Sequence, residues 1–220
     1  MPSVDVVNIS KSGVTLLAGD ALRAWMDREA SLPSMTEELL PHIALLCNES
    51  RKQLVLFVVT WLFTTGDKNR SKYVRVFETE VASGSKLLIS SIGQAAAFPG
   101  ATLRQPIPEM TPRHTRLVLD AVLFADGTTE GIDSTGAVGD LLFQFRLFGS
   151  LVRGYETGVS ESAMFLEARS AATMHGGGRS HFRRKLAEDL LREYENQGLD
   201  GAVFFARQSL ASLPAIRIDQ

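Results

Sequence analysis

The chain has little of what marks an exported or membrane-anchored protein. Its single cysteine, Cys47, cannot form a disulfide within the chain, and we expect this thiol to be packed in the core. The first residues, Met1–Asp5, show no basic segment followed by an apolar one, so no secretory signal is recognised. The longest apolar run, Leu54–Phe63, is far shorter than the roughly 20 residues that cross a bilayer. We therefore expect no membrane insertion, and a cytoplasmic location by default.

Motifs of catalysis and cofactor binding are also missing. The stretch His175–Gly178 is similar to an oxyanion loop, but no Gly-x-Ser-x-Gly accompanies it, so we interpret its glycines as a helix stop. No glycine-rich phosphate loop follows a predicted strand, and the four histidines lack zinc-ligand spacing. The formal net charge of −2 argues against a dedicated nucleic-acid binder. The sequence therefore predicts no cofactor, no metal and no clear nucleic-acid binding.

What the chain does have is 45% hydrophobic residues and a series of short apolar segments separated by turn residues. Strands are predicted over Ile43–Cys47, Leu54–Phe63, Tyr73–Val81, Lys86–Ile92 and Leu117–Phe124. The second of these is apolar on both faces, so we expect it to be central and covered on both sides. Because the strands do not alternate with helices, an antiparallel β-sandwich is favoured over a parallel sheet.

The clearest local signal is the segment Arg116–Gly131. Its apolar strand alternates on one face and runs into Asp126-Gly127, the strongest short-range indication of a tight hairpin. The segment therefore predicts a strand, a reversal at the acidic turn and a returning strand.

Helices are predicted on either side of this β region. The N-terminal segment, residues 1–41, reads as an extended stretch over Ser3–Val14 and a helix over Leu16–Ala30. Residues 140–157 fit either a strand or a helix, and the helix is favoured. Further helices are predicted over Ser160–Met174, Ser180–Gln197 and Asp200–Leu213, with Ser180 as a cap and Gly198 as a stop.

Some features of the β region also carry a family resemblance. They are Asn48-x-Ser50-x-Lys52, Thr60–Phe63, Pro99-Gly100 and Leu119–Thr128 closed by Gly131-Ile132-Asp133. Over about Ile43 to Asp133 the chain resembles a loose group of uncharacterised bacterial β-sandwich proteins. The resemblance implies an immunoglobulin-like strand succession ending in a helical stretch, and it brings no catalytic residues. Many members are exported, whereas this chain lacks a signal, and it has Ile132 where the group often has proline.

The predicted fold is thus mainly β with C-terminal helices. An N-terminal segment, residues 1–41, precedes an antiparallel immunoglobulin-like β-sandwich over residues 42–136. A helical region, residues 137–220, is expected to pack on the sandwich.

Two clusters of charge are candidate ligand-binding residues. Asp126, Glu130 and Asp133 crowd one loop, where carboxylates could hold calcium, but their spacing matches no calcium loop and turn hydrogen bonds explain them better. Arg183 and Arg184 belong to a basic cluster with Arg179 and Lys185 at a helix start, which could bind an anion. Pairing within the helix, Arg184 with Glu188 and Lys185 with Asp189, is a sufficient explanation of that cluster.

The sequence favours a non-catalytic binding or protein-interaction module, with a protein partner or a homo-oligomer. The alternative is a hydrolase-type enzyme whose loop-assembled site lies around His114, Asp126 and Glu130. A third hypothesis is self-association through the aromatic side chains Phe143, Phe145 and Phe148.

Overall fold

The computed structural model describes residues 3–8, 11, 13–29, 39–66, 70–91 and 112–216. About 43% of the structure is helical and about 33% is strand, so the fold is mixed α and β rather than mainly β. The chain divides into two compact units. One contains residues 1–134 and the C-terminal segment from Ala215, and the other spans Thr135–Pro214. The predicted loop over Gly93–Pro112 lies almost entirely outside the described residues.

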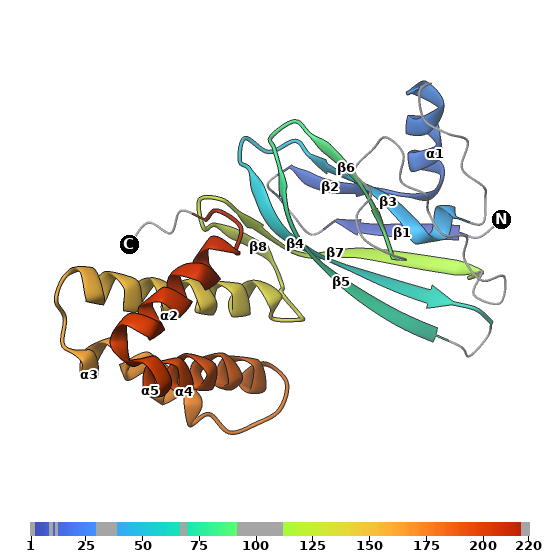
Figure 1. The fold of residues 1–220 in the computed structure, drawn as a ribbon. Helices are drawn as coiled ribbons and strands as arrows, with labels where there is room; N and C mark the ends of the chain where they lie inside the picture. Colours follow the sequence, from blue (N-terminus) through green and yellow to red (C-terminus); the bar gives the residue numbers. More distant parts are fainter. Residues whose placement is uncertain are drawn as a thin grey trace. The chain divides into compact units, whose positions relative to one another are not determined.

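The first unit is built on a sheet with strand order β1-β7-β4-β5 (Figure 1). Its strands are β1 (Ser3–Asn8), β7 (His114–Phe124), β4 (Leu54–Thr64) and β5 (Arg70–Val81), and β8 (Thr129–Gly131) pairs with β7. The predicted central position of the apolar strand β4 is confirmed, since β7 and β5 flank it. The predicted hairpin is confirmed too, because β7 and β8 pair antiparallel across the Asp-Gly turn.

One strand of this sheet comes from the N-terminal segment, outside the predicted antiparallel sandwich, and it is parallel, because β1 runs in the same direction as β7. A parallel pair needs a long connection between its strands, and more than 100 residues separate Asn8 from His114. No hairpin therefore fixes the direction of β1.

A second sheet has the order β2-β3-β6 and is antiparallel throughout. It consists of β2 (Val14–Leu17), β3 (Ile43–Asn48) and β6 (Lys86–Ser90), and a short 3-10 turn, η1 (Leu40–His42), leads into β3. The predicted helix over Leu16–Ala30 is wrong at its start. Val14 and Leu16 alternate with less buried neighbours, as strand residues do, and helix α1 (Gly19–Arg28) begins only afterwards.

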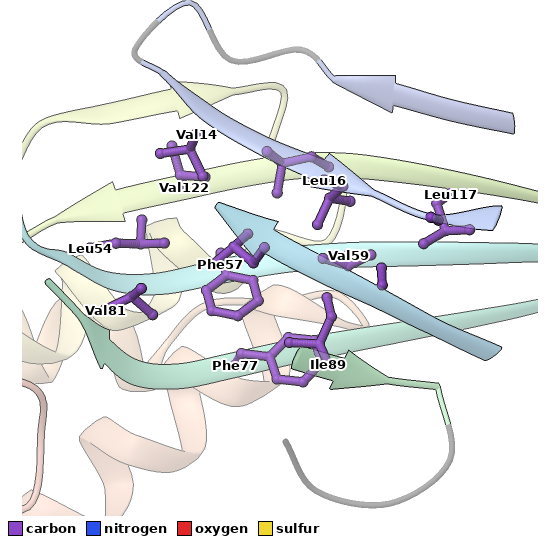
Figure 2. Packing of buried hydrophobic residues seen from close by; sticks show 14 of the residues in the cluster. Val14, Leu16, Leu54, Phe57, Val59, Phe77, Val81, Ile89, Leu117 and Val122 are labelled. Carbon is purple, nitrogen blue, oxygen red and sulfur yellow. The ribbon is translucent and has the colours of Figure 1, made fainter. Parts of the chain in front are cut away.

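The two sheets share one hydrophobic core, which Figure 2 shows from close by. Alternate side chains of β4, among them Phe57, Val59 and Trp61, are completely buried in it. Phe57 stacks on Phe77 of β5, with ring centroids 4.7 Å apart. Burying each large apolar side chain stabilises the fold by about 1.5–3 kcal/mol, so this core holds the sheets together. Cys47 is buried as predicted, in a neighbouring cluster with Leu22 and Ile43.

The second unit is helical. Its elements are α2 (Ala137–Glu156), α3 (Glu161–Met164), α4 (Leu166–Ala172) and α5 (Arg179–Ala211). The favoured helix over residues 140–157 is confirmed by α2. The single helix predicted over Ser160–Met174 is wrong, because Phe165 has φ −93° and ψ 4° and divides it into two. Phe165 is completely buried, so packing of this side chain accompanies the break.

Helix α5 contains both of the last predicted helices, joined at Gly198. This glycine has φ 70° and ψ −167°, a conformation that interrupts the helix and that other residues rarely adopt. The predicted stop at Gly198 is therefore confirmed. The predicted cap at Ser180 is wrong, because the helix begins one residue earlier and Gly178 occupies the cap position.

Two phenylalanine side chains of α2, Phe143 and Phe148, face the interior of the helical unit. Phe148 is fully buried and meets Phe205 edge to face at 5.7 Å, and Phe143 is 4% exposed. Phe145 is half-buried. The hypothesis of a contact surface made by these three residues is wrong, because the unit needs two of them for its own core. No helix in the described part of the chain combines the length and the apolar character needed to span a bilayer.

His42 is a buried ionisable side chain in the sheet unit, only 2% exposed. Its Nδ1 lies 3.1 Å from the Ser91 hydroxyl, its ring lies 4.8 Å from Phe63, and Nε2 has no hydrogen-bond partner among the described residues. Burial lowers the pKa of His42 below the ordinary value of 6.5. The unfolded chain therefore takes up the proton more readily than the folded one.

We expect the free energy of unfolding to be fully maintained above pH 6.5 and to decline as the pH falls through the lowered pKa of His42. The contribution of this one group cannot exceed about 1.4 kcal/mol per pH unit. Denaturant unfolding at a series of pH values should show a shallower decline in His42→Gln than in the wild type. His114→Gln, which changes a more exposed histidine, should keep the decline. Equal slopes in the wild type and His42→Gln would contradict this role.

Candidate functional site

The acidic loop between β7 and β8 uses its first carboxylate to build the turn. Asp126 Oδ1 accepts hydrogen bonds from the Thr128 amide at 3.0 Å and the Thr128 hydroxyl at 2.5 Å. Its Oδ2 lies 2.7 Å from Lys52 Nζ. These contacts, led by the one with Lys52, hold the pKa of Asp126 at about 2. The turn hydrogen bond expected of Asp126 is present, because its Oδ1 accepts from the Thr128 amide.

The other two carboxylates of this loop have surroundings of their own. Glu130 lies in β8, and its Oε2 accepts a hydrogen bond of 2.8 Å from the Lys11 amide. Asp133 follows β8 with φ 49°, in the left-handed region that turns use. Within the described residues, no three His, Cys, Asp or Glu side chains are grouped so that they could hold a metal ion.

Two of the basic residues at the start of α5, Arg183 and Arg184, are paired with acids of the helical unit. Arg183 Nε lies 2.8 Å from Asp140 Oδ1, and its guanidinium lies over the Phe143 ring at 5.3 Å. Arg184 forms the predicted pair with Glu188 at 3.6 Å, and its Nη2 lies 3.0 Å from His181 Nδ1. These pairs leave Arg183 and Arg184 with little uncompensated charge for an anion.

The second predicted pair of this cluster is wrong. Asp189 contacts Arg192 Nη2 at 2.7 Å instead of Lys185. The two partners are three residues apart, so they too lie on one face of the helix.

The suggested enzymatic trio is not brought together. His114 begins β7, opposite Thr64, whereas Asp126 follows the other end of the strand, where Phe124 lies opposite Leu54. The whole of β7 therefore separates the imidazole from the carboxylate, a distance of about 30 Å at 3.3 Å per residue. A site that needs direct contact between His114 and Asp126 is excluded by this register.

The structure instead places a positively charged cavity at the His114 end of the large sheet. The cavity has a volume of about 360 Å³. Its lining residues are Leu62, Phe63, Thr64, Arg70, Ser71, Lys72, His114 and Arg116, and we call it the cationic pocket. Three strands contribute to it, and all three belong to the sheet unit.

The strand register explains why the charges converge there. Thr64 of β4 is opposite Arg70 on one side and His114 on the other. Two residues earlier, Leu62 is opposite Lys72 and Arg116. Side chains two residues apart lie on the same face of a sheet, so the two rows present four basic side chains on one face.

In the described part of the chain, the permanent charges of the cationic pocket form no ion pair. Among the described residues, no carboxylate oxygen lies within 4.0 Å of a charged nitrogen of Arg70, Lys72 or Arg116. Arginine presents a planar fork of donors that matches a phosphate or a carboxylate, and lysine adds a point charge. The arrangement can therefore bind an anionic group.

The fourth basic side chain, His114, is held in place by β1. The hydroxyl of Ser3 lies 2.8 Å from His114 Nδ1, and Asp5 Oδ2 lies 3.6 Å from His114 Nε2. These residues are neighbours because β1 pairs in parallel with β7 and Ser3 is opposite His114. The contacts orient the imidazole at the edge of the cationic pocket, with both ring nitrogens towards residues of β1.

Comparison with known proteins adds no relative. No family model, no curated protein and no solved structure matches the chain.

Proposed function

We propose that this protein is a non-catalytic binding module that takes a small anionic ligand in the cationic pocket. The observation that carries the proposal is the convergence of Arg70, Lys72 and Arg116 on one face, without acidic partners among the described residues. Like charges gathered on one sheet face repel each other, and an anion bound between them would relieve that repulsion. An anionic ligand therefore stabilises this arrangement of charges more than a neutral or cationic ligand would.

The shape of the cationic pocket favours a ligand with more than one anionic oxygen. Arg70 and Lys72 approach from β5, and Arg116 and His114 approach from β7, with β4 between them. Strands β5 and β7 lie about 10 Å apart, at two strand spacings, so long basic side chains from both strands can reach one phosphate or a compact polycarboxylate. Leu62, on the same face as the basic side chains, adds apolar surface that lowers the local polarity and strengthens charge attraction.

Kinship with bacterial immunoglobulin-like sandwich proteins is part of the proposal. Support comes from two facing sheets with one shared core and from the helices that follow them. The parallel pairing of β1 with β7 sets a limit on how far the strand order can be compared with that group.

Replacing Arg116 with glutamine tests the proposed site. Calorimetric titration with inorganic phosphate and with citrate, at low and at moderate salt, should show binding to the wild type and affinity at least about tenfold weaker in Arg116→Gln. This expectation follows from a charged hydrogen bond being worth about 1.5–3 kcal/mol. A preference between the two anions would identify phosphate or carboxylate as the recognised group.

The matched control is Arg51→Gln, which removes the same charge from an exposed position in the turn between β3 and β4. This variant should bind as the wild type does. The proposal fails if the wild type binds neither anion, or if both substitutions weaken binding equally, since the second result would show a general charge effect.

A further inference from the structure

Strand β5 forms one edge of the large sheet and is unusually open for its length. It has 12 residues, and no described strand pairs with its outer side, as Figure 1 shows. Three of its apolar side chains are exposed, Tyr73 at 38%, Val74 at 37% and Val76 at 41%. An exposed edge offers unpaired backbone groups to any further strand, and natural proteins usually guard such edges.

The charges on β5 are separated along the strand. Arg70 and Lys72 make its first half basic, and Glu78 and Glu80 make its second half acidic. All four side chains are exposed and stand at even-numbered positions together with Val74 and Val76. This pattern is self-complementary, because a copy that runs antiparallel brings the basic half against the acidic half.

One register matches the even-numbered positions of the regular part of the strand, from Lys72 to Glu78. Directly opposed residues of an antiparallel pair of identical strands must have position numbers with an even sum, because hydrogen-bonded positions face each other. In the register with sum 150, Lys72 faces Glu78 of the second copy and Val74 faces Val76. Arg70 then lies beside the acidic end of the second strand, where Glu80 follows the register irregularity after Glu78. Each interaction occurs twice because the pairing has two-fold symmetry.

We propose that β5 pairs with β5 of a second copy of this chain in this register and joins the two large sheets. Opposite charges and apolar side chains that face each other across strands each stabilise such a pair. This inference goes beyond the proposed ligand and does not depend on it.

Two local features limit the strength of the pairing. Arg75 lies on the two-fold axis and faces its own copy, although its guanidinium also lies 5.9 Å from the Phe77 ring. A register irregularity follows Glu78, which ends the regular part of the edge. The contact is also confined to one strand edge, so we expect a dimer that dissociates on dilution.

Sedimentation equilibrium of the whole chain and of two charge-reversed variants tests the pairing. Glu78→Lys/Glu80→Lys makes the strand basic throughout, and Arg70→Glu/Lys72→Glu makes it acidic throughout. Each variant alone should dimerise more than about tenfold more weakly than the wild type, because the attraction between the basic and the acidic halves becomes repulsion. An equimolar mixture of the two should form heterodimers, because the complementary halves then face each other again.

A matched control is Asp27→Lys/Glu29→Lys, which makes the same change of charge at exposed positions at the end of α1. It should dimerise like the wild type. A wild type that stays monomeric at high micromolar concentration overturns the pairing, as do variants that fail to recover in the mixture. Anion titration of Glu78→Lys/Glu80→Lys separates the two proposals, because this variant keeps Arg70, Lys72 and Arg116.

Discussion

Gly131→Ala is expected to lower the free energy of unfolding of the sheet unit by about 3–5 kcal/mol. Gly131 ends β8 with φ +98°, a conformation that costs other residues strain. A Cβ atom there would lie 2.2 Å from the Asp120 carbonyl oxygen and 2.8 Å from the Ala121 Cα. Both atoms belong to the backbone of β7, so the hairpin would have to separate to make room.

Gly84→Ala is the matched control for this prediction. Gly84 also has positive φ, +76°, but a Cβ atom there would meet nothing within 4 Å. We expect it to cost only the backbone strain, about 1–2 kcal/mol. Urea unfolding followed by tryptophan fluorescence measures both, because Trp25 and Trp61, the two tryptophans of the chain, lie in the sheet unit. An equal decrease in the free energy of unfolding in both variants would show that the close contact at Gly131 does not contribute to the effect.

The elements that the sequence predicts best are those whose signal is local. The strands β4 and β7 and the turn at Asp126-Gly127 follow from apolar runs and turn residues within a few positions. The sequence also favours a helix over a strand for α2, because its apolar residues recur at helical spacing. In each case the neighbours in sequence are also the neighbours that decide the structure.

Where distant pairing decides, sequence patterns are insufficient. Strand β1 lies parallel to β7, and the sequence predicts the start of a helix where β2 lies, although the burial of β2 alternates. The partner of β2 is β3, some 30 residues further along the chain. A four-residue strand carries too few positions to show alternation by itself, so its partner supplies the missing information.

The sequence indicates part of the cationic pocket, but the pocket as a whole depends on pairing between distant strands. Arg70 and Lys72 are two residues apart at the start of β5, and His114 and Arg116 are two residues apart at the start of β7. Such spacing places each pair on one face of its own strand. Only the register against Leu62 and Thr64 shows that both pairs occupy the same face and the same end of the sheet.

The two proposals meet at Arg70 and Lys72, which line the cationic pocket and also lie on the edge of β5. A second copy would supply Glu78 and Glu80 to these cations, and a bound anion would supply its own oxygens. Arg116 and His114, on β7, are not part of the edge and stay available to a ligand in the dimer. An anion bound tightly by Arg70 and Lys72 should therefore compete with the second copy.

Asn48→Ala is expected to lower the free energy of unfolding of the sheet unit by about 3–5 kcal/mol, because it leaves several buried polar groups without a partner. Asn48 is completely buried at the end of β3. Its Nδ2 donates to the carbonyls of Lys52 at 2.9 Å, Val81 at 2.8 Å and Ala82 at 3.2 Å. Its Oδ1 accepts from the Ser50 amide at 3.2 Å and the Ser50 hydroxyl at 2.5 Å. One amide thus joins the turn after β3 to the end of β5.

Two further variants distinguish the loss of the Asn48 hydrogen bonds from the loss of side-chain volume. Asn48→Asp keeps the size and the acceptor for Ser50, but it points an oxygen at three carbonyl groups, so at neutral pH it should lose at least as much stability as the alanine variant. Asn8→Ala removes two side-chain hydrogen bonds to the Leu16 backbone at a far more exposed position, and it should cost only about 1 kcal/mol. Urea unfolding followed by tryptophan fluorescence ranks the three. An Asn48→Asp variant as stable as the wild type would show that the hydrogen bonds from Nδ2 to Lys52, Val81 and Ala82 do not stabilise the fold.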